Sequence, residues 1–201
     1  MRTQRLALVC IGVAALGAIA WAGATAGRSD RSSISAARDN GLVDQRGEPF
    51  ATEQLRGKTV VLNFIFTHCP GICPLQTQAL RRVAAALPEP VREHVHFVSV
   101  SVDPERDTPR ELTLFAKKHG VDLERWTFVT GREQELRALG ESYSAQALPT
   151  GAGPLDHRTE IRLINAEGRL MQTYTGNPLD EPRLAREIET VDELFNRKAS
   201  R

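Results

Sequence analysis

Few cysteines and no excess of charge of either sign are the first features of this sequence. Its 201 residues include three cysteines, and 26 Lys and Arg stand against 25 Asp and Glu. A balanced charge argues against a nucleic-acid partner, and there is no acidic tail. Three cysteines are too few for a fold built on disulfide bonds. We therefore expect a protein that does not bind nucleic acid and that folds around a hydrophobic core.

Internal repeats and low-complexity segments are also absent from the sequence. Hydrophobic residues make up 41% of the chain, which is enough to bury one sizeable core. A second full domain is not expected at this length.

One long uncharged stretch stands at the N-terminus. Arg2 and Arg5 precede residues 6–27, which contain no charged side chain. The run reaches the roughly 20 residues that span a bilayer as a helix. A cleaved signal peptide is the alternative, with a cleavage region among the small residues 22–26, but the length favours an uncleaved anchor. We predict a transmembrane signal anchor over 1–27, a polar linker over 28–40 and a domain over 41–197.

The remaining chain alternates between strand and helix patterns. Residues 59–66 are apolar on both alternating faces, which predicts a buried central strand. Strands that alternate with helices, followed by a hairpin and a closing helix, predict an open α/β sheet. This order is compatible with a thioredoxin-like fold, a central mixed sheet flanked by helices. The further strands are expected at 95–103, 126–129, 160–165 and 169–175, and the helices at 75–87, 108–120, 131–141 and from 180 onward.

One helix start is predicted in detail by its side chains. Thr108 is a helix-capping residue and Pro109 suits the first turn, where its missing amide has no partner. Glu111 stands where a capping box would place it, so the helix should begin at Thr108 and end at Gly120.

Cys69 and Cys73 lie where the buried strand 59–66 meets the start of a helix. In open α/β sheets, ligands gather at the carboxyl ends of the strands, and a helix N-terminus stabilises a thiolate. The spacing of four residues places both sulfurs on one helix face. Such a pair can form a disulfide, act as reactive thiols or hold a metal ion, and the pattern leaves these alternatives open.

A soft metal ion would need a third ligand, and histidine is the best candidate. His157 follows a Gly- and Pro-rich loop and precedes a predicted strand, so it could reach the cysteine pair, with Asp156 orienting it. Two thiolates and one imidazole suit Cu(I), whereas a structural zinc site would want a fourth ligand. The other histidines are interpreted as a neighbour that tunes Cys69 or as surface residues: His68, His94, His96 and His119.

Three separated motifs, FTHCPGICP, SVDPERDTP and LDHRTEIRLINAEGRL, together resemble the Sco/SenC family of copper-binding assembly factors for cytochrome c oxidase. The resemblance covers roughly residues 40–195 and implies a thioredoxin-like fold. It implies copper, as Cu(I) or Cu(II), held by Cys69, Cys73 and His157. Asp103 falls on an accessory acidic residue of the family.

Two features of these motifs bear on that resemblance. Asp103 could instead only cap the loop after its strand, with Arg106 and Asp107 as a solvated pair. Gly71 stands where family members often carry an acidic residue, which removes a negative charge beside the metal.

The resemblance implies a copper metallochaperone that delivers copper to the dinuclear copper centre of cytochrome c oxidase subunit II. It implies an inner-membrane protein whose domain faces the periplasm, together with another copper chaperone and a thiol reductase as partners. The alternative function is a thiol–disulfide reductase that uses Cys69 and Cys73 as a redox-active pair. A thiol peroxidase ranks last, because no activating arginine and threonine are evident at Cys69 in the sequence.

Overall fold

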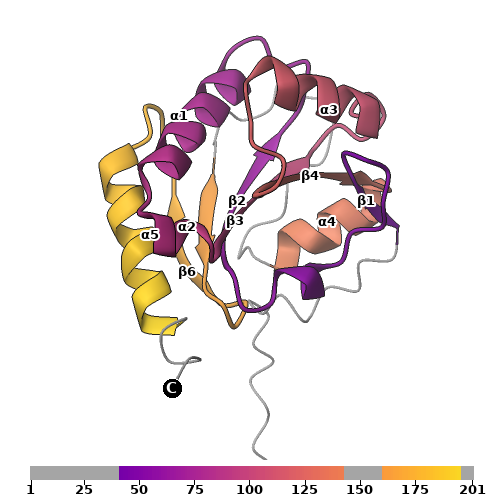
Figure 1. Ribbon diagram of the computed structural model, residues 1–201. Helices are drawn as coiled ribbons and strands as arrows, with labels where there is room; N and C mark the ends of the chain where they lie inside the picture. The colour runs from indigo at the N-terminus through magenta and orange to yellow at the C-terminus, as the bar shows by residue number, and fades with distance from the viewer. Residues whose placement is uncertain (1–40, 143–159, 196–201) are drawn as a thin grey trace, which may run out of the picture.

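A six-stranded mixed sheet forms the centre of the protein (Figure 1). The computed structural model describes residues 41–142 and 160–195. Within them the strand order is β1-β4-β3-β2-β5-β6. The strands are β1 Leu42–Asp44, β2 Thr59–Ile65, β3 Val95–Ser101, β4 Trp126–Gly131, β5 Ile161–Ile164 and β6 Leu170–Tyr174.

The three central strands, β4, β3 and β2, run parallel. Three antiparallel pairs complete the sheet: β1 with β4, β5 with β2, and β6 with β5. All seven residues of β3 are buried, and in β2 only Phe64 is partly exposed. Because helices cover both faces of the sheet, its central strands need apolar side chains on both sides. The predicted central mixed sheet is therefore confirmed.

Helices pack on both faces of this sheet. Side chains of α1, α3 and α5 share one hydrophobic cluster, and α4 joins a second cluster with β1 and the 3₁₀ turn η2. In Figure 1, α5 runs alongside α1 on one side of the molecule, and these two helices are in contact. The bounds are η2 Thr52–Leu55, α1 Ile72–Ala86, α2 Glu89–Arg92, α3 Pro109–Lys118, α4 Glu133–Ser142 and α5 Glu181–Phe195.

The predicted start of α3 is confirmed in its details. The Thr108 hydroxyl accepts a hydrogen bond from the Glu111 amide at 3.3 Å, and Pro109 occupies the first helical position. His119 caps the other end, and Gly120 follows in the left-handed region with φ +64°. A glycine adopts this conformation at little cost, so the helix ends where the sequence indicated.

Two differences from the prediction concern helix starts and short elements. The helix α1 begins at Ile72 and not at Leu75, so Cys73 lies inside its first turn. The strand β1 and the short helix α2 were not predicted, because three or four residues carry no measurable periodicity.

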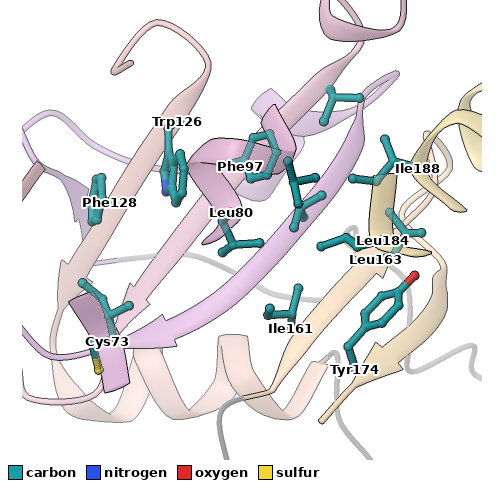
Figure 2. Close-up of a cluster of buried hydrophobic side chains, with 14 of the residues drawn as sticks. Cys73, Leu80, Phe97, Trp126, Phe128, Ile161, Leu163, Tyr174, Leu184 and Ile188 are labelled. Carbon is teal, nitrogen blue, oxygen red and sulfur yellow. The ribbon is translucent and has the colours of Figure 1, made fainter. Parts of the chain in front are cut away.

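Aromatic rings and aliphatic side chains fill the larger cluster (Figure 2). The rings of Phe97 and Trp126 stack with centroids 4.9 Å apart, and Phe128 lies 5.9 Å beyond Trp126. Leu80 of α1 packs into this cluster and is fully buried. Cys69 and Cys73 belong to the same cluster, so the cysteine pair is packed against the larger part of the core.

None of the described helices is long and apolar enough to cross a membrane. The predicted anchor 1–27 and linker 28–40 lie outside the described residues, so the anchor remains an expectation.

Candidate metal and thiol site

Cys69 and Cys73 meet at the junction between β2 and α1, as the sequence predicted. The chain leaves β2 after Ile65, turns through 67–71 and enters α1 at Ile72. Both cysteines are free thiols with only 7% and 4% of their surface exposed. The Cys73 amide donates a hydrogen bond to the Cys69 sulfur at 3.4 Å. The two sulfurs therefore lie on the same side of the first helical turn.

The first turn of α1 favours the thiolate form of Cys69. Burial alone would raise the pKa of this thiol, but hydrogen bonds from the amides of Cys73, Gly71 and Ile72 together lower it below its ordinary value. These amides have no partner inside the helix, so they are free to stabilise a negative sulfur.

Cys73 has the opposite character. Burial raises the pKa of its thiol to about 12, and the neighbouring Cys69 sulfur and the Asp107 carboxylate act in the same direction. A buried thiol beside two negative groups keeps its proton. The pair is therefore asymmetric, since the pKa of Cys69 is lowered and that of Cys73 is raised.

Asp107 is a buried carboxylate that joins the ends of two parallel strands. It is 0% exposed and accepts hydrogen bonds from the Thr67 amide at 3.0 Å, the Thr67 hydroxyl at 2.6 Å and the Ser101 hydroxyl at 2.6 Å. The expectation that Asp107 forms a solvated pair with Arg106 is wrong. The reason is that β2 and β3 end at the same edge of the sheet, so their following residues close around one carboxylate.

Arg106 pairs instead with Asp103, the predicted accessory residue. The Arg106 Nε donates to the Asp103 carboxylate at 2.6 Å, and the Asp103 amide donates to the Ser101 hydroxyl at 3.1 Å. The Asp103 carbonyl also accepts from the amides of Arg106 and Asp107. Asp103 thus organises the loop after β3, and within the described part of the chain its carboxylate pairs with an arginine and not with a cysteine.

His68 is tied to the same group of hydrogen bonds through Thr67. Its Nδ1 lies 3.0 Å from the Thr67 hydroxyl oxygen, whose hydrogen is donated to Asp107. His68 therefore donates from Nδ1, an assignment that follows from the hydrogen bonds. The side chain is exposed, and its ring fixes the turn next to Cys69.

The prediction that His96 is a surface residue is wrong. Only 8% of it is exposed, and its Nε2 lies 2.9 Å from the Thr127 hydroxyl on β4. Burial, with a smaller effect from Lys58, lowers the pKa of His96 to about 4. Because helices and loops cover both faces of the sheet at β3, a side chain of this strand is buried whichever face it points to. His94, just before the strand, is exposed as predicted, and its Nδ1 faces Asp192 at 3.5 Å.

The full predicted ligand set is not contained in the described residues. Among residues 41–142 and 160–195, no group of three or more His, Cys, Asp or Glu side chains could hold a metal ion. His157, the predicted third ligand, and Asp156 lie outside these ranges. What the described part supplies is two adjacent sulfur donors, which are the donor type that soft metal ions prefer.

The family model of SCO1/SenC matches residues 29–193. The chain belongs to the SCO1/SenC family. The SCO1 protein homolog of Bacillus subtilis is 31% identical over 136 residues, which cover 66% of this chain and 70% of that protein. A Stutzerimonas stutzeri protein named for copper binding is 32% identical over 133 residues, and these cover 64% of each chain. This SCO1/SenC chain therefore spans just under two thirds of that relative.

Solved structures of the family share this fold. BsSco, described as a member of the Sco family of cytochrome c oxidase assembly proteins with a disulfide switch, superposes with a TM-score of 0.65 at 25% identity. The match covers 75% of this chain and 90% of BsSco. ScoI of Bradyrhizobium japonicum, solved with copper bound, gives a TM-score of 0.60 at 27% identity, covering 75% and 96%. The predicted thioredoxin-like fold is confirmed, and members of the family take part in copper handling for oxidase assembly.

Gly71, where this SCO1/SenC chain departs from the motif, is the residue before α1, with φ −146° and ψ −73°. No heavy atom lies within 4 Å of the position a Cβ would take. An acidic side chain would therefore meet no neighbouring atom there, and the glycine removes a charge beside Cys69.

Proposed function

We propose that this protein is a copper metallochaperone, which binds one copper ion and delivers it to the dinuclear copper centre of cytochrome c oxidase subunit II. Cys69, Cys73 and His157 are the proposed ligands, and Asp103 is an accessory residue. Family membership supports this function, and the observation that carries it is the pair of adjacent free thiols at the start of α1.

The donor set fits copper as a cargo better than it fits a permanent structural metal. Two sulfurs and one imidazole suit Cu(I), and three protein ligands would leave a position for an incoming ligand of the target. The lowered pKa of Cys69 favours metal binding, because the thiolate is the ligand. Cys73 keeps its proton in the free protein, so copper binding at its sulfur should release that proton.

The proposed location is the inner membrane, with residues 1–27 as the anchor, 28–40 as the linker and the domain in the periplasm. In that oxidising compartment the two thiols can become a disulfide, which cannot bind copper until it is reduced. A thiol reductase is therefore a proposed partner, and a second periplasmic copper chaperone is the proposed source of the metal.

The test is a copper titration of the reduced full-length protein with Cu(I) and Cu(II). We expect one ion per chain, with tight binding lost in Cys69→Ser and Cys73→Ser and weakened in His157→Ala. His119→Ala is the matched control, because His119 caps α3 away from the pair. A wild-type protein that binds no copper contradicts the function, whereas unchanged binding in His157→Ala contradicts only that ligand.

The asymmetry of the two thiols favours a second candidate function, reduction of a disulfide in the target copper site. The Cys69 thiolate attacks one sulfur of the target disulfide and forms a mixed disulfide, which releases the first target thiolate. Cys73 then loses its proton and attacks the Cys69 sulfur, which releases the second target thiol. The target gains two electrons, and the Cys69–Cys73 disulfide formed here needs an external thiol reductant.

One experiment distinguishes the two functions, with a disulfide-bonded peptide from the copper domain of subunit II as the substrate. If reduction occurs, Cys73→Ser should accumulate a mixed disulfide through Cys69, and Cys69→Ser should form none. No release of target thiols by the reduced wild type would exclude the reductase activity, while leaving the copper titration unaffected.

A further inference from the structure

A cavity of about 220 Å³ opens between the end of α1, the short helix α2 and the loop that joins α3 to β4, away from the cysteine pair. It lies at the amino ends of β3 and β4, whereas the cysteines lie at the carboxyl end of β2. Along α1, the cavity borders the last turns and Cys73 the first, a separation of roughly 15–20 Å at 1.5 Å per residue. The residues that shape it are Arg81, Leu87, Arg92, Phe97, Arg125 and Trp126.

The floor of this cavity is apolar and rigid. Phe97 and Trp126 form it with their stacked rings, which Figure 2 shows side by side, and Leu87 adds an aliphatic wall. The Trp126 indole N–H is already donated to the Ser99 hydroxyl at 2.9 Å. The side chains of Leu87, Phe97 and Trp126 are 1%, 3% and 2% exposed, so the floor offers a ligand a narrow apolar surface and no free indole donor.

Three guanidinium groups stand around the cavity, and they are incompletely paired. Within the described chain, Arg81 has no hydrogen bond or ion pair through its side chain, and its Nη1 would lie only 3.1 Å from a Cβ at Gly120. Arg125 has a carboxylate partner, Glu89, only at 3.9 Å. Both groups have N–H donors available for an anion.

Arg92 is the best-fixed member of the three. Its Nη2 donates to the carbonyls of Ala85 and Leu87, and its Nη1 pairs with Glu89 at 2.9 Å. Its Nε is buried with no hydrogen-bond partner in the described residues. Counting Asp122, which also lines the cavity, three arginines face two carboxylates, so the cavity carries one positive charge in excess.

We propose that this cavity binds a small amphipathic anion, with a ring or short aliphatic body on the aromatic floor and a carboxylate or phosphate held by Arg81 and Arg125. The volume suits this class, since a cavity of about 150 Å³ already accepts a benzene ring. The fork of an arginine side chain matches the two oxygens of a carboxylate. Neither the cysteines nor the proposed copper chemistry enters this assignment.

Trp126 gives a direct readout, because the sequence holds only two tryptophans. In a Trp21→Phe background of the full-length protein, Trp126 is the only tryptophan and lies at the cavity floor. The probe is cyclohexanecarboxylate, which does not absorb where tryptophan does. Its neutral counterpart is cyclohexylmethanol, and inorganic phosphate tests charge without an apolar body. Binding is followed by Trp126 emission and by calorimetry in parallel.

We expect saturable binding of cyclohexanecarboxylate, with the alcohol and phosphate each weaker by about tenfold or more, as the loss of a charge-assisted hydrogen bond or of apolar contact implies. The double variant Arg81→Gln with Arg125→Gln should bind cyclohexanecarboxylate at least about tenfold more weakly than the wild type. Arg186→Gln, an exposed arginine of α5, is the matched control and should leave binding unchanged.

Three results overturn the proposal. The first is no heat and no emission change with cyclohexanecarboxylate. The second is equal binding of the neutral alcohol, which would mean that charge does not contribute, or equal binding of phosphate, which would mean that apolar contact does not contribute. The third is unchanged affinity in the double variant while its circular dichroism matches the wild type.

Discussion

The Asp107 carboxylate accepts hydrogen bonds from both the amide and the hydroxyl of Thr67, which lies 40 residues earlier in the chain, at 3.0 and 2.6 Å. Thr67 begins the turn that carries Cys69, and His68 donates to the same hydroxyl oxygen. One buried carboxylate thus fixes the turn that presents the thiolate, from a position outside the predicted ligand set.

Replacing this carboxylate by the amide in Asp107→Asn should lower the free energy of unfolding by about 1–3 kcal/mol. An amide can accept from Thr67 but turns a donor toward Ser101, so a buried hydroxyl loses its acceptor. Urea unfolding at pH 7 measures the change. The matched control is Asp103→Asn, whose exposed pair with Arg106 should contribute less than about 1 kcal/mol. Equal losses in both variants would contradict the role assigned to Asp107.

Alkylation should distinguish the two cysteines of the reduced protein. Cys69, whose pKa the amides of α1 lower, should react with iodoacetamide at neutral pH, while Cys73 with a pKa of about 12 should stay unmodified. Peptide mass spectrometry over time measures both rates. Cys73→Ser should keep the fast reaction, and Cys69→Ser should lose it. Faster labelling of Cys73 than of Cys69 in the wild type would contradict the asymmetry.

Two leucines of α1, one buried and one exposed, should contribute very differently to the stability of the protein. Leu80 is fully buried in the cluster of Figure 2, so Leu80→Ala should destabilise the protein by about 2–5 kcal/mol. Leu75 is 54% exposed on the same helix, so Leu75→Ala should change stability by less than about 1 kcal/mol. Chemical denaturation of both variants tests this. A large loss in Leu75→Ala would show that its side chain is covered in solution.

His96 should make the protein less stable in mild acid. Its pKa is about 4 in the folded state against about 6.5 when exposed, because burial opposes the charged ring. Below pH 6.5 the unfolded chain binds a proton that the folded protein excludes, so stability is complete above pH 6.5 and is lost as the pH falls toward 4. The loss should approach about 3 kcal/mol at pH 4.

The measurement for His96 is urea unfolding between pH 4 and pH 7.5, compared with His96→Gln, which has no ring to protonate. Leu75→Ala, which removes an exposed side chain without a titratable group, is the control and should keep the wild-type pH dependence of this window. If His96→Gln loses stability over the same pH range as the wild type, another group is responsible.

The sequence was most informative where a local pattern has a local cause. The apolar runs of β2 and β3 identified them as buried central strands, since only a strand covered on both faces needs such a run. Thr108 and Pro109 marked the start of α3 because capping depends on adjacent residues. The start of α1 was missed because periodicity begins at Leu75, whereas Pro74 sits in the first turn, where amides need no partner.

The sequence by itself determined the α/β order, the family motifs and the placement of Cys69 and Cys73 at a strand–helix junction. Each of these patterns is formed by residues that are near neighbours in the chain, so the sequence alone shows it. Only the tertiary structure decided that Asp107 is buried against Thr67, that His96 is buried beside Thr127, and that burial raises the pKa of Cys73 while the amides of the next turn lower that of Cys69. Burial depends on the packing of the whole domain, and the parallel pairing of β3 with β2 and with β4 brings Asp107 and His96 to partners far away in sequence.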